Sequence, residues 1–394
     1  MRKIELLSPA GDLERLKYAI MYGADAVYIG GKHYSLRSAA SNFSLEDIKE
    51  GCVFAHNHNA KIYVTCNIVM HEIDLNGLLD YLKSLENCGV DAVIASSPTI
   101  ISLVKKNTSM EAHVSTQQSI SNHKGIDFFK ELGADRVVLA RECDIQNIKE
   151  ICKNTSTEIE VFIEGAMCAG VSGRCMLSNI MTNRDANRGG CAQSCRWNYD
   201  IYQNNIKVSK NQFDFSMSSC DLNAIEFIPQ LIESGVASLK IEGRMKSLHY
   251  IATVVNAYRR CIDEYYETKN IKDFETYKTN LARGENREVS HGFFNGELTT
   301  KEEIYNHGIA SASHDFVGII LSYDKENHLA IMEERNVFKG NRNIEVLSPN
   351  VEPFSVKIGD IYDFSGNKID EARQSKMKIK FYCDIELHQN DLIR

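Results

Sequence analysis

The sequence predicts an α/β fold of the (β/α)8 type, a TIM-like barrel with a long cysteine-bearing insertion after strand seven and a small C-terminal β domain. Short β-branched runs alternate with amphipathic helical stretches, and these runs count to eight before the pattern changes. Near-continuous apolar strands separated by helices require a parallel sheet covered by helices. Eight such strands favour a closed barrel over the alternative, an open doubly wound sheet.

The eight strands follow one another at regular intervals, and four of them share a sequence pattern. In GADAVYIG, GVDAVIAS, GADRVVLARE and GVASLKIEGR, a glycine ends a helix directly before an apolar run. The helical run at 247–269 then supplies the last barrel helix. The expected strands cover residues 4–8, 26–30, 61–67, 92–96, 111–116, 136–142, 158–164 and 238–244.

Two domains are expected. The barrel should occupy residues 1–310, with the cysteine-rich insertion at about 165–237. The polar, glycine-containing stretch RGENREVSHGFFNGE reads as a loop of the barrel or a hinge. The alternating runs FVGIILSYD, HLAIMEERN, NIEVLSP, FSVKIGDIYDF and KIKFYCDI predict a β-barrel or β-sandwich over 311–394.

Composition and charge narrow the classes of function. The chain of 394 residues is 43% hydrophobic, which is enough for a large core. No long apolar window predicts a membrane span, and the N-terminal run lacks a signal-like core, so we expect a cytoplasmic protein without a membrane partner. The formal charge of -8 argues against a general nucleic-acid coat protein. A local basic patch remains expected, because Arg174, Arg184, Arg188 and Arg196 crowd the cysteine segment.

Cys168, Cys175, Cys191 and Cys195 lie in the glycine-rich runs GAMCAGVSGRCMLSN and RGGCAQSCRWNY. Thiolates are soft ligands for zinc and iron–sulfur clusters, and glycines let the backbone wrap closely around a ligand. The spacing C-x6-C-x15-C-x3-C lacks zinc-ribbon knuckles and matches neither common ferredoxin pattern, so it favours a cluster over zinc only modestly. Buried free thiols and a disulfide are the alternatives. Packing accounts for Cys52, Cys66, Cys88, Cys143, Cys152, Cys261 and Cys383.

Active sites of such barrels form at the C-terminal ends of the strands, where the long insertion would cap the mouth. Charged residues there are costly unless they are paired or used, which makes Glu164, Glu242 and Arg244 the candidate catalytic residues. The alternative is that they cap helices or pair with each other. Other polar residues end strands at Ser8, Tyr28, Asn67, Ser96, Ser115, Gln117, Arg141, Glu142 and Lys240.

Several long motifs identify a family resemblance. ELLSPAGDLERLKYAIMYGADAVYIGG, EVFIEGAMCAGVSGRCMLSN with GGCAQSCRW, and SLKIEGRMKS together resemble the collagenase-like peptidase family, unassigned peptidase family thirty-two. The C-terminal NVFKGNRNIEVLSP with FSVKIGD resembles the accessory β domain of its tRNA-hydroxylating branch. The resemblance implies an iron–sulfur cluster, 4Fe-4S, on the four cysteines. It also implies that Cys220 could replace one of these four ligands, although a thiol that binds no metal is the favoured interpretation of Cys220.

The resemblance further implies an enzyme that forms 5-hydroxyuridine at the wobble position of tRNA, with prephenate as hydroxyl donor. The dicarboxylate would suit arginine side chains, and Arg174, Arg196 and Lys240 are the candidate substrate-binding residues. An anticodon base can be splayed out and stacked on aromatic rings. Candidates for stacking are Trp197, Tyr199, Phe293 and Phe294, and candidates for phosphate contact are Lys246, Arg259 and Arg260, with core packing and solvated helix faces as the alternatives.

Two other classes of function stay open from the residues. The first is a collagenase-like peptidase, although the chain has no HExxH or G-x-S-x-G motif, and His56 and His58 lack an identifiable ligand partner. The second is a non-catalytic iron–sulfur partner that works in a heteromeric complex with a paralogous family member. A homo-oligomer is also compatible with the sequence.

Overall fold

The structure, a computed structural model, describes residues 3–36, 42–209, 215–284, 287–296, 298–299, 303–304 and 316–394. Eight parallel strands within these ranges close into a barrel, because β14 pairs with both β1 and β7. They are β1 (Glu5–Pro9), β2 (Ala26–Gly30), β3 (Lys61–Cys66), β4 (Ala92–Ala95), β5 (Glu111–Val114), β6 (Arg136–Val138), β7 (Glu158–Ala166) and β14 (Ser238–Ile241). The predicted fold class and all eight predicted strands are confirmed.

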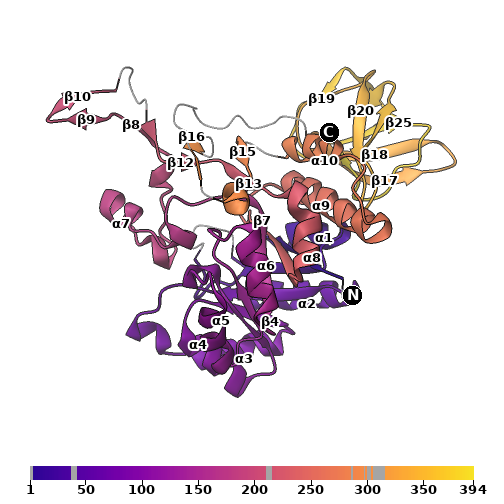
Figure 1. Cartoon of the computed structure of the whole chain (residues 1–394). Helices are drawn as coiled ribbons and strands as arrows, with labels where there is room; N and C mark the ends of the chain where they lie inside the picture. Colours follow the sequence, from indigo (N-terminus) through magenta and orange to yellow (C-terminus); the bar gives the residue numbers. More distant parts are fainter. Residues whose placement is uncertain are drawn as a thin grey trace.

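Helices surround the barrel (Figure 1). Several begin at a side chain that accepts a backbone hydrogen bond, as at Asp12, Ser44, Asn122, Asp144 and Ser247. The covering helices are α1 (Leu13–Met21), α2 (Leu45–Asn57), α3 (Leu78–Asn87), α4 (Pro98–Asn107), α5 (His123–Glu131), α6 (Ile145–Lys153), α8 (Ile228–Ser234) and α9 (Leu248–Thr268).

The repeated glycine pattern ends a helix and also joins neighbouring strands. Its four glycines all have positive φ, between 84° and 112°, so each ends a helix in the left-handed region. In three repeats the aspartate that follows accepts a hydrogen bond from a backbone N–H of the preceding strand, which joins neighbouring strands at their N-terminal ends. The bonds join Leu6 to Asp25 (2.8 Å), Ile62 to Asp91 (2.7 Å) and Ala112 to Asp135 (2.8 Å).

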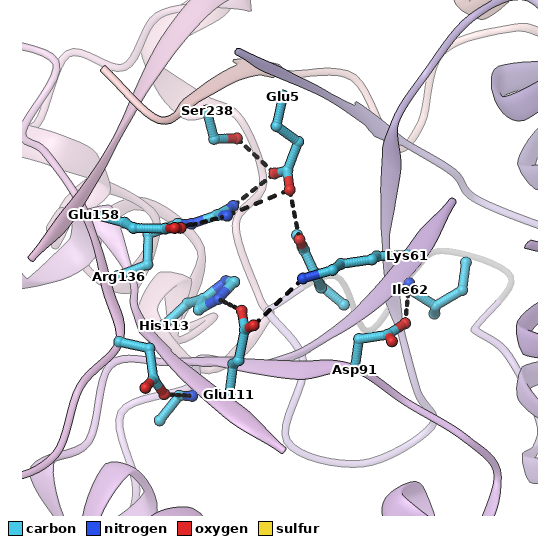
Figure 2. A network of polar contacts seen from close by, with 12 residues as sticks. Glu5, Lys61, Ile62, Asp91, Glu111, His113, Arg136, Glu158 and Ser238 are labelled. Atoms are coloured by element: carbon cyan, nitrogen blue, oxygen red, sulfur yellow. Dashed lines mark hydrogen bonds and ion pairs between the residues drawn. The ribbon is translucent and has the colours of Figure 1, made fainter. Parts of the chain in front are cut away.

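The floor of the barrel, at the N-terminal ends of the strands, is a charged network (Figure 2). Arg136, with 1% of its side chain exposed, forms ion pairs with Glu5 (2.6 Å), Glu158 (2.8 Å) and the fully buried Glu160 (3.2 Å). Lys240 lies 2.7 Å from the other oxygen of Glu160. Above these charges the interior is filled by Leu7, Ala26, Tyr28, Tyr63, Ala92 and Ile94.

Strand β7 is longer than its neighbours and leaves the barrel at its end. Its last residues, Glu164 to Ala166, pair antiparallel with β13 (Asp221–Asn223), which in turn pairs with β15 (Val289–Ser290). Between β7 and β14 the register shifts, so that Lys240 aligns with Phe162 but Ile241 aligns with Glu164. This β-bulge changes which residues of β7 face the interior.

The C-terminal part, from β17 onward, forms an antiparallel sheet with its own apolar core. The sheet order is β21 (Phe354–Lys357), β20 (Asn343–Leu347), β26 (Leu392–Ile393), β17 (Gly318–Asp324), β18 (Leu329–Glu334), β25 (Lys378–Tyr382), β22 (Ile361–Tyr362), β23 (Lys368–Ile369), and β19 (Phe338–Lys339) pairs with β24 (Glu371–Ala372). The predicted domain boundary at 310/311 lies outside the described residues.

The C-terminal sheet packs against α1, α9 and α10 (Phe274–Ala282), on the side of the molecule away from α7 (Figure 1). The Tyr22 hydroxyl lies 2.8 Å from the carbonyl oxygen of Leu347, and Arg394 donates to the side chain of Asn280 at 2.8 Å. Ile319 and Leu392 join the apolar cluster of the barrel. No helix in the described part of the chain has the length and apolar character needed to cross a bilayer.

Candidate functional site

The segment after β7 forms an irregular cap beside the barrel mouth (Figure 1). The predicted insertion at 165–237 is only partly separate, because β13 and α8 rejoin the barrel. The cap contains η3 (Val171–Gly173), α7 (Leu177–Thr182), η4 (Ala186–Arg188), η5 (Ser194–Arg196), the paired β8 (Asn198–Tyr199) and β11 (Phe215–Ser216), the hairpin β9 (Tyr202–Gln203) and β10 (Ile206–Lys207), and β12 (Ser218–Ser219).

Hydrogen bonds of three charged side chains, Glu142, Arg174 and Arg188, hold this cap against the barrel. Glu142, after β6, accepts from the backbone N–H of Ser172 at 2.8 Å and from its hydroxyl at 2.6 Å. Arg174 donates to the carbonyl oxygen of Gln117. Arg188 forms a two-point ion pair with Asp74, which follows β3, and also donates to the carbonyl oxygen of Val69 at 2.7 Å.

The ion pair of Arg188 with Asp74 should therefore limit local opening of the cap. Its hydrogen bond lowers the pKa of Asp74 to about 2, so the ion pair is intact at neutral pH and is lost only as the pH falls toward that value. We expect Arg188→Ala to speed limited proteolysis of residues 167–209 by roughly fivefold at pH 7, because cleavage follows local opening. The matched control is Arg184→Ala, which removes an exposed arginine of the same segment. Equal cleavage rates in the two variants would show that Arg188 does not hold the cap.

The four cysteines of the central motif come together in this cap. All are free thiols; Cys168 and Cys191 are exposed, and Cys175 and Cys195 are half-buried. Backbone N–H groups of Leu177 and Gln193 donate to the sulfur atoms of Cys175 (3.3 Å) and Cys191 (3.4 Å). Gly170 is needed at this place, because a Cβ there would lie 2.6 Å from the carbonyl oxygen of Arg174.

The thiol of Cys195 interacts electrostatically with the other three cysteines. Burial raises the pKa of Cys195, negative charge on Cys168, Cys191 and Cys175 raises it further, and Arg196 lowers it. Among the described residues, no three His, Cys, Asp or Glu side chains stand in position for one metal ion. A single ion needs all its thiolates about 2.3 Å away, whereas the thiolates of a polynuclear cluster bind different metal atoms and stand further apart. The donor set of free thiols with N–H···S contacts fits such a cluster.

The three predicted catalytic residues do not share one surface. Because of the bulge, Glu164 aligns with the core-facing Ile241, is 1% exposed, and accepts from the hydroxyl of Tyr258 on α9 at 2.8 Å. The carbonyl oxygen of Glu242 accepts from Tyr250 at 3.1 Å. Arg244 is 7% exposed and donates to the hydroxyls of Ser35 (3.0 Å), in the loop after β2, and Thr65 (3.1 Å), near the end of β3. Of the three, Arg244 lies among polar groups of the mouth.

The predicted substrate-binding residues lie at three depths. Lys240 is fully enclosed inside the barrel, where its ammonium group is paired with Glu160 and lies 4.6 Å from the ring centre of Tyr28. Arg174 is exposed at the mouth. Arg196 donates to the carbonyl oxygen of Met167 at 3.0 Å and to the hydroxyl of Ser218 at 3.2 Å, directly beside the cysteines.

Sequence reasoning missed Asp221, which organises the cations at this edge. Asp221 is 2% exposed and faces three cationic side chains: Arg287 (3.0 Å), Lys246 (3.4 Å) and Arg196 (3.9 Å). Three positive charges around one carboxylate leave two in excess. The sequence had indicated two of these cations, Arg196 as a candidate substrate-binding residue and Lys246 as a candidate phosphate contact, but not the carboxylate that they share.

A cavity of about 130 Å³ opens between the end of β7 and the β13–β15 pair. Its walls combine apolar side chains with a few polar groups. It is lined by Glu142, Met167, Cys168, Ala169, Gly170, Val171, Ser219, Cys220, Ser290, Gly292, Phe293 and Leu298. Cys220, the alternative cluster ligand, thus shares a cavity with Cys168.

The remaining predicted RNA contacts divide between core and surface. Phe294 is buried against Phe227, while Trp197 is 42% exposed and Phe293 lines the cavity. The hydroxyl of Tyr199 donates to the carbonyl oxygen of Ser194. The helix α9 arginines are paired with carboxylates, Arg259 with Asp25 and Asp263, and Arg260 with Glu352.

The two histidines considered for a peptidase site have ordinary partners. His56 pairs with Asp91, and His58 contacts the carbonyl oxygen of Phe54.

Comparison with known proteins agrees with this organisation. The profile described as peptidase family U32 matches residues 11–304, and that of the peptidase family U32 C-terminal domain matches residues 312–394. The tRNA hydroxylation protein P1 of Bacillus subtilis is 45% identical, over 100% of this chain and 95% of that protein.

Two further relatives carry different names. The 23S rRNA 5-hydroxycytidine C2501 synthase of Escherichia coli is 33% identical over 96% of this chain and 56% of its own length. A collagenase of Porphyromonas gingivalis is 32% identical over 74% of each chain. The similarity to the collagenase therefore covers less of the chain than the similarity to the hydroxylation proteins.

Proposed function

Because the chain belongs to peptidase family U32, with both of its domains matched, we propose that it is an enzyme of RNA hydroxylation that acts on tRNA. The observation that supports this most is the similarity over the entire chain to a protein named for tRNA hydroxylation. The product we propose is 5-hydroxyuridine at the wobble position of the anticodon loop. A relative named for 5-hydroxycytidine indicates that hydroxylation of a pyrimidine is a chemistry within the family.

We further propose that Cys168, Cys175, Cys191 and Cys195 hold an iron–sulfur cluster of the 4Fe-4S type. Their free thiols, their mutual proximity and the N–H···S contacts support this assignment. Such a cluster supplies one-electron redox chemistry that side chains lack. The protein's own contribution is to position the substrate beside it and to hold the cap closed through Glu142 and Arg188.

The reaction needs an oxygen donor. Replacing C5–H of the base by C5–OH oxidises the base by two electrons, so a donor R–OH becomes R–H as its hydroxyl is transferred. We propose prephenate, a dicarboxylate, as this donor. Arg244 is the candidate to bind one of its carboxylates, because its guanidinium lies at the mouth between the hydroxyls of Ser35 and Thr65. Arg174 is the candidate for the second.

Two other functions compete with this proposal. Similarity to a collagenase favours peptide hydrolysis. His56, His113 and His291 each pair with a carboxylate, as a triad histidine does, but in the described part of the chain none of these rings forms a hydrogen bond with a serine hydroxyl or a cysteine thiol. A non-catalytic iron–sulfur partner would need a paralogous chain for activity. Activity of the purified chain alone on peptides, or on tRNA only after a paralogue is added, would favour these alternatives.

The proposed function predicts a gain of modification in a suitable host. A bacterium that lacks its own family U32 proteins should acquire 5-hydroxyuridine in its tRNA when it produces this chain, because the closed barrel and the four cysteines lie in one polypeptide. Digested tRNA is measured by nucleoside mass spectrometry, with the empty vector as control. An iron-loaded chain that leaves the tRNA without hydroxylated pyrimidine would contradict the proposal.

A further inference from the structure

We propose that the cavity between Cys168 and Phe293 receives one unstacked pyrimidine base of the RNA. This inference rests on the proposed function and specifies where that function would take place. Enzymes that modify a base remove it from its stack and enclose it in a close-fitting pocket. The cavity, at about 130 Å³, is of the size of a single heterocyclic ring and is too small to enclose a whole nucleotide.

Apolar side chains in the walls of the cavity suit the flat faces of a base. Phe293, Met167 and Val171 are apolar, and an aromatic ring stacks on any base. Phe293 is presented by a turn in which Gly292 has a φ of 53°, while the next residue, Phe294, packs in the core. The two adjacent phenylalanines thus have different positions, and only Phe293 lines this cavity.

Polar groups at the cavity match the hydrogen-bonding edge of a pyrimidine. Both oxygens of Glu142 accept from Ser172, and each keeps a second lone pair that can accept an N–H of the base. The hydroxyl of Ser290 accepts from the backbone N–H of Gly292 at 3.1 Å, so its hydrogen can be donated to a base carbonyl. The carboxylate of Glu142 would thereby accept from an N–H of the base, and the hydroxyl of Ser290 would donate to a carbonyl of the base.

Charge beside the cavity favours the RNA backbone. Asp221 directly follows Cys220 on the chain, and Arg196, Lys246 and Arg287 surround it. These three cations outnumber the carboxylate of Asp221 and can attract a phosphate. A base in the cavity would therefore have its backbone next to a cationic edge, while the total charge of the chain remains -8.

The cavity also borders the cysteine site without coinciding with it. Cys168 lines the cavity, but Cys175, Cys191 and Cys195 do not. A base in the cavity would lie against a ligand of the proposed cluster.

Binding of two RNA hairpins tests this assignment. One is an anticodon stem-loop with uridine at the wobble position, and the other is abasic there. The full chain, purified anaerobically, should bind the abasic hairpin about tenfold more weakly by fluorescence anisotropy, because stacking of the base is lost. Phe293→Ala and Phe293→Leu should bind the intact hairpin about tenfold more weakly than wild type, with the abasic hairpin bound equally by all three. Leucine keeps an apolar side chain and tests stacking separately from folding.

Phe128→Ala is the matched control, because Phe128 is a 54% exposed phenylalanine on α5. This variant should bind the intact hairpin about tenfold more tightly than the abasic hairpin, as wild type does. Equal binding of both hairpins by wild type would overturn the inference, as would loss of iron in Cys220→Ala to the extent seen in Cys168→Ala, since the cavity would then hold the cluster. Discrimination by a wild-type chain that modifies no tRNA would support the pocket and reject the proposed reaction.

Discussion

Cys175→Ser should purify anaerobically with less than about a tenth of the iron and sulfide of wild type, since loss of even an outer-shell partner costs a metal site tenfold or more. Cys175, one of the four proposed ligands, is half-buried in the cap: its sulfur accepts from the backbone N–H of Leu177, and its carbonyl oxygen accepts from the side-chain amide of Asn187. Serine has a similar size, so these contacts and the fold should persist. The absorbance of the cluster and the hydroxylation of tRNA should disappear together.

Cys152→Ser is the matched control for this experiment. Cys152 is also a half-buried free thiol, but it lies on α6 outside the cap. The control should keep full iron content, an unchanged absorbance spectrum and full modification. If Cys175→Ser kept its iron, or if zinc replaced iron in wild type, the cluster assignment and the redox chemistry proposed for it would both be wrong.

The barrel could be predicted because local signals and the fold agree. The glycine of each repeated pattern ends a helix with positive φ, and the apolar run that follows is buried on both faces, so each strand position was readable from a few neighbouring residues. Strand β6 is the main difference, since it ends at Val138 rather than at the predicted residue 142. Its extension instead becomes the loop that carries Glu142 to the cap.

The site could be predicted only in part, because side-chain direction depends on register. Glu164 follows the alternation of β7 in sequence, but the bulge turns it toward Tyr258 and α9. Lys240 looked like a residue of the mouth, yet its position in β14 places it deep in the barrel against Glu160. Asp221 was missed because its three cationic partners come from separate segments.

The two ends of the barrel use charge differently. At the mouth, cations outnumber the carboxylate of Asp221 and lie partly exposed, which suits recruitment of an anionic substrate. At the floor, Arg136 and Glu160 are buried, and Arg136 has its charge divided among three carboxylates. The floor therefore serves stability, and its disruption should affect folding without direct contact with the chemistry.

Arg136→Met should destabilise the chain by about 3–5 kcal/mol at pH 7, because the buried Glu160 would keep only part of its compensating charge, from Lys240, and Glu5 and Glu158 would lose their ion pairs with Arg136. Burial opposes ionisation of Glu160, but Lys240 and Arg136 outweigh it and hold the pKa of Glu160 below its usual value. That contribution to stability is present above the pKa of an unfolded glutamate and is lost as the pH falls through the folded value. Removing Arg136 should raise the pKa of Glu160.

The difference in free energy of unfolding between wild type and Arg136→Met should therefore decrease as the pH falls below about 4.3. In that range the buried carboxyl groups become protonated, so loss of the guanidinium charge no longer destabilises them. Urea unfolding of both proteins across this pH range measures the difference. Arg373→Met, which removes a 69% exposed arginine paired with Glu371, should change stability by less than about 0.5 kcal/mol. A loss for Arg136→Met that is equally small, or that stays constant with pH, would mean that the buried network does not hold the barrel floor together.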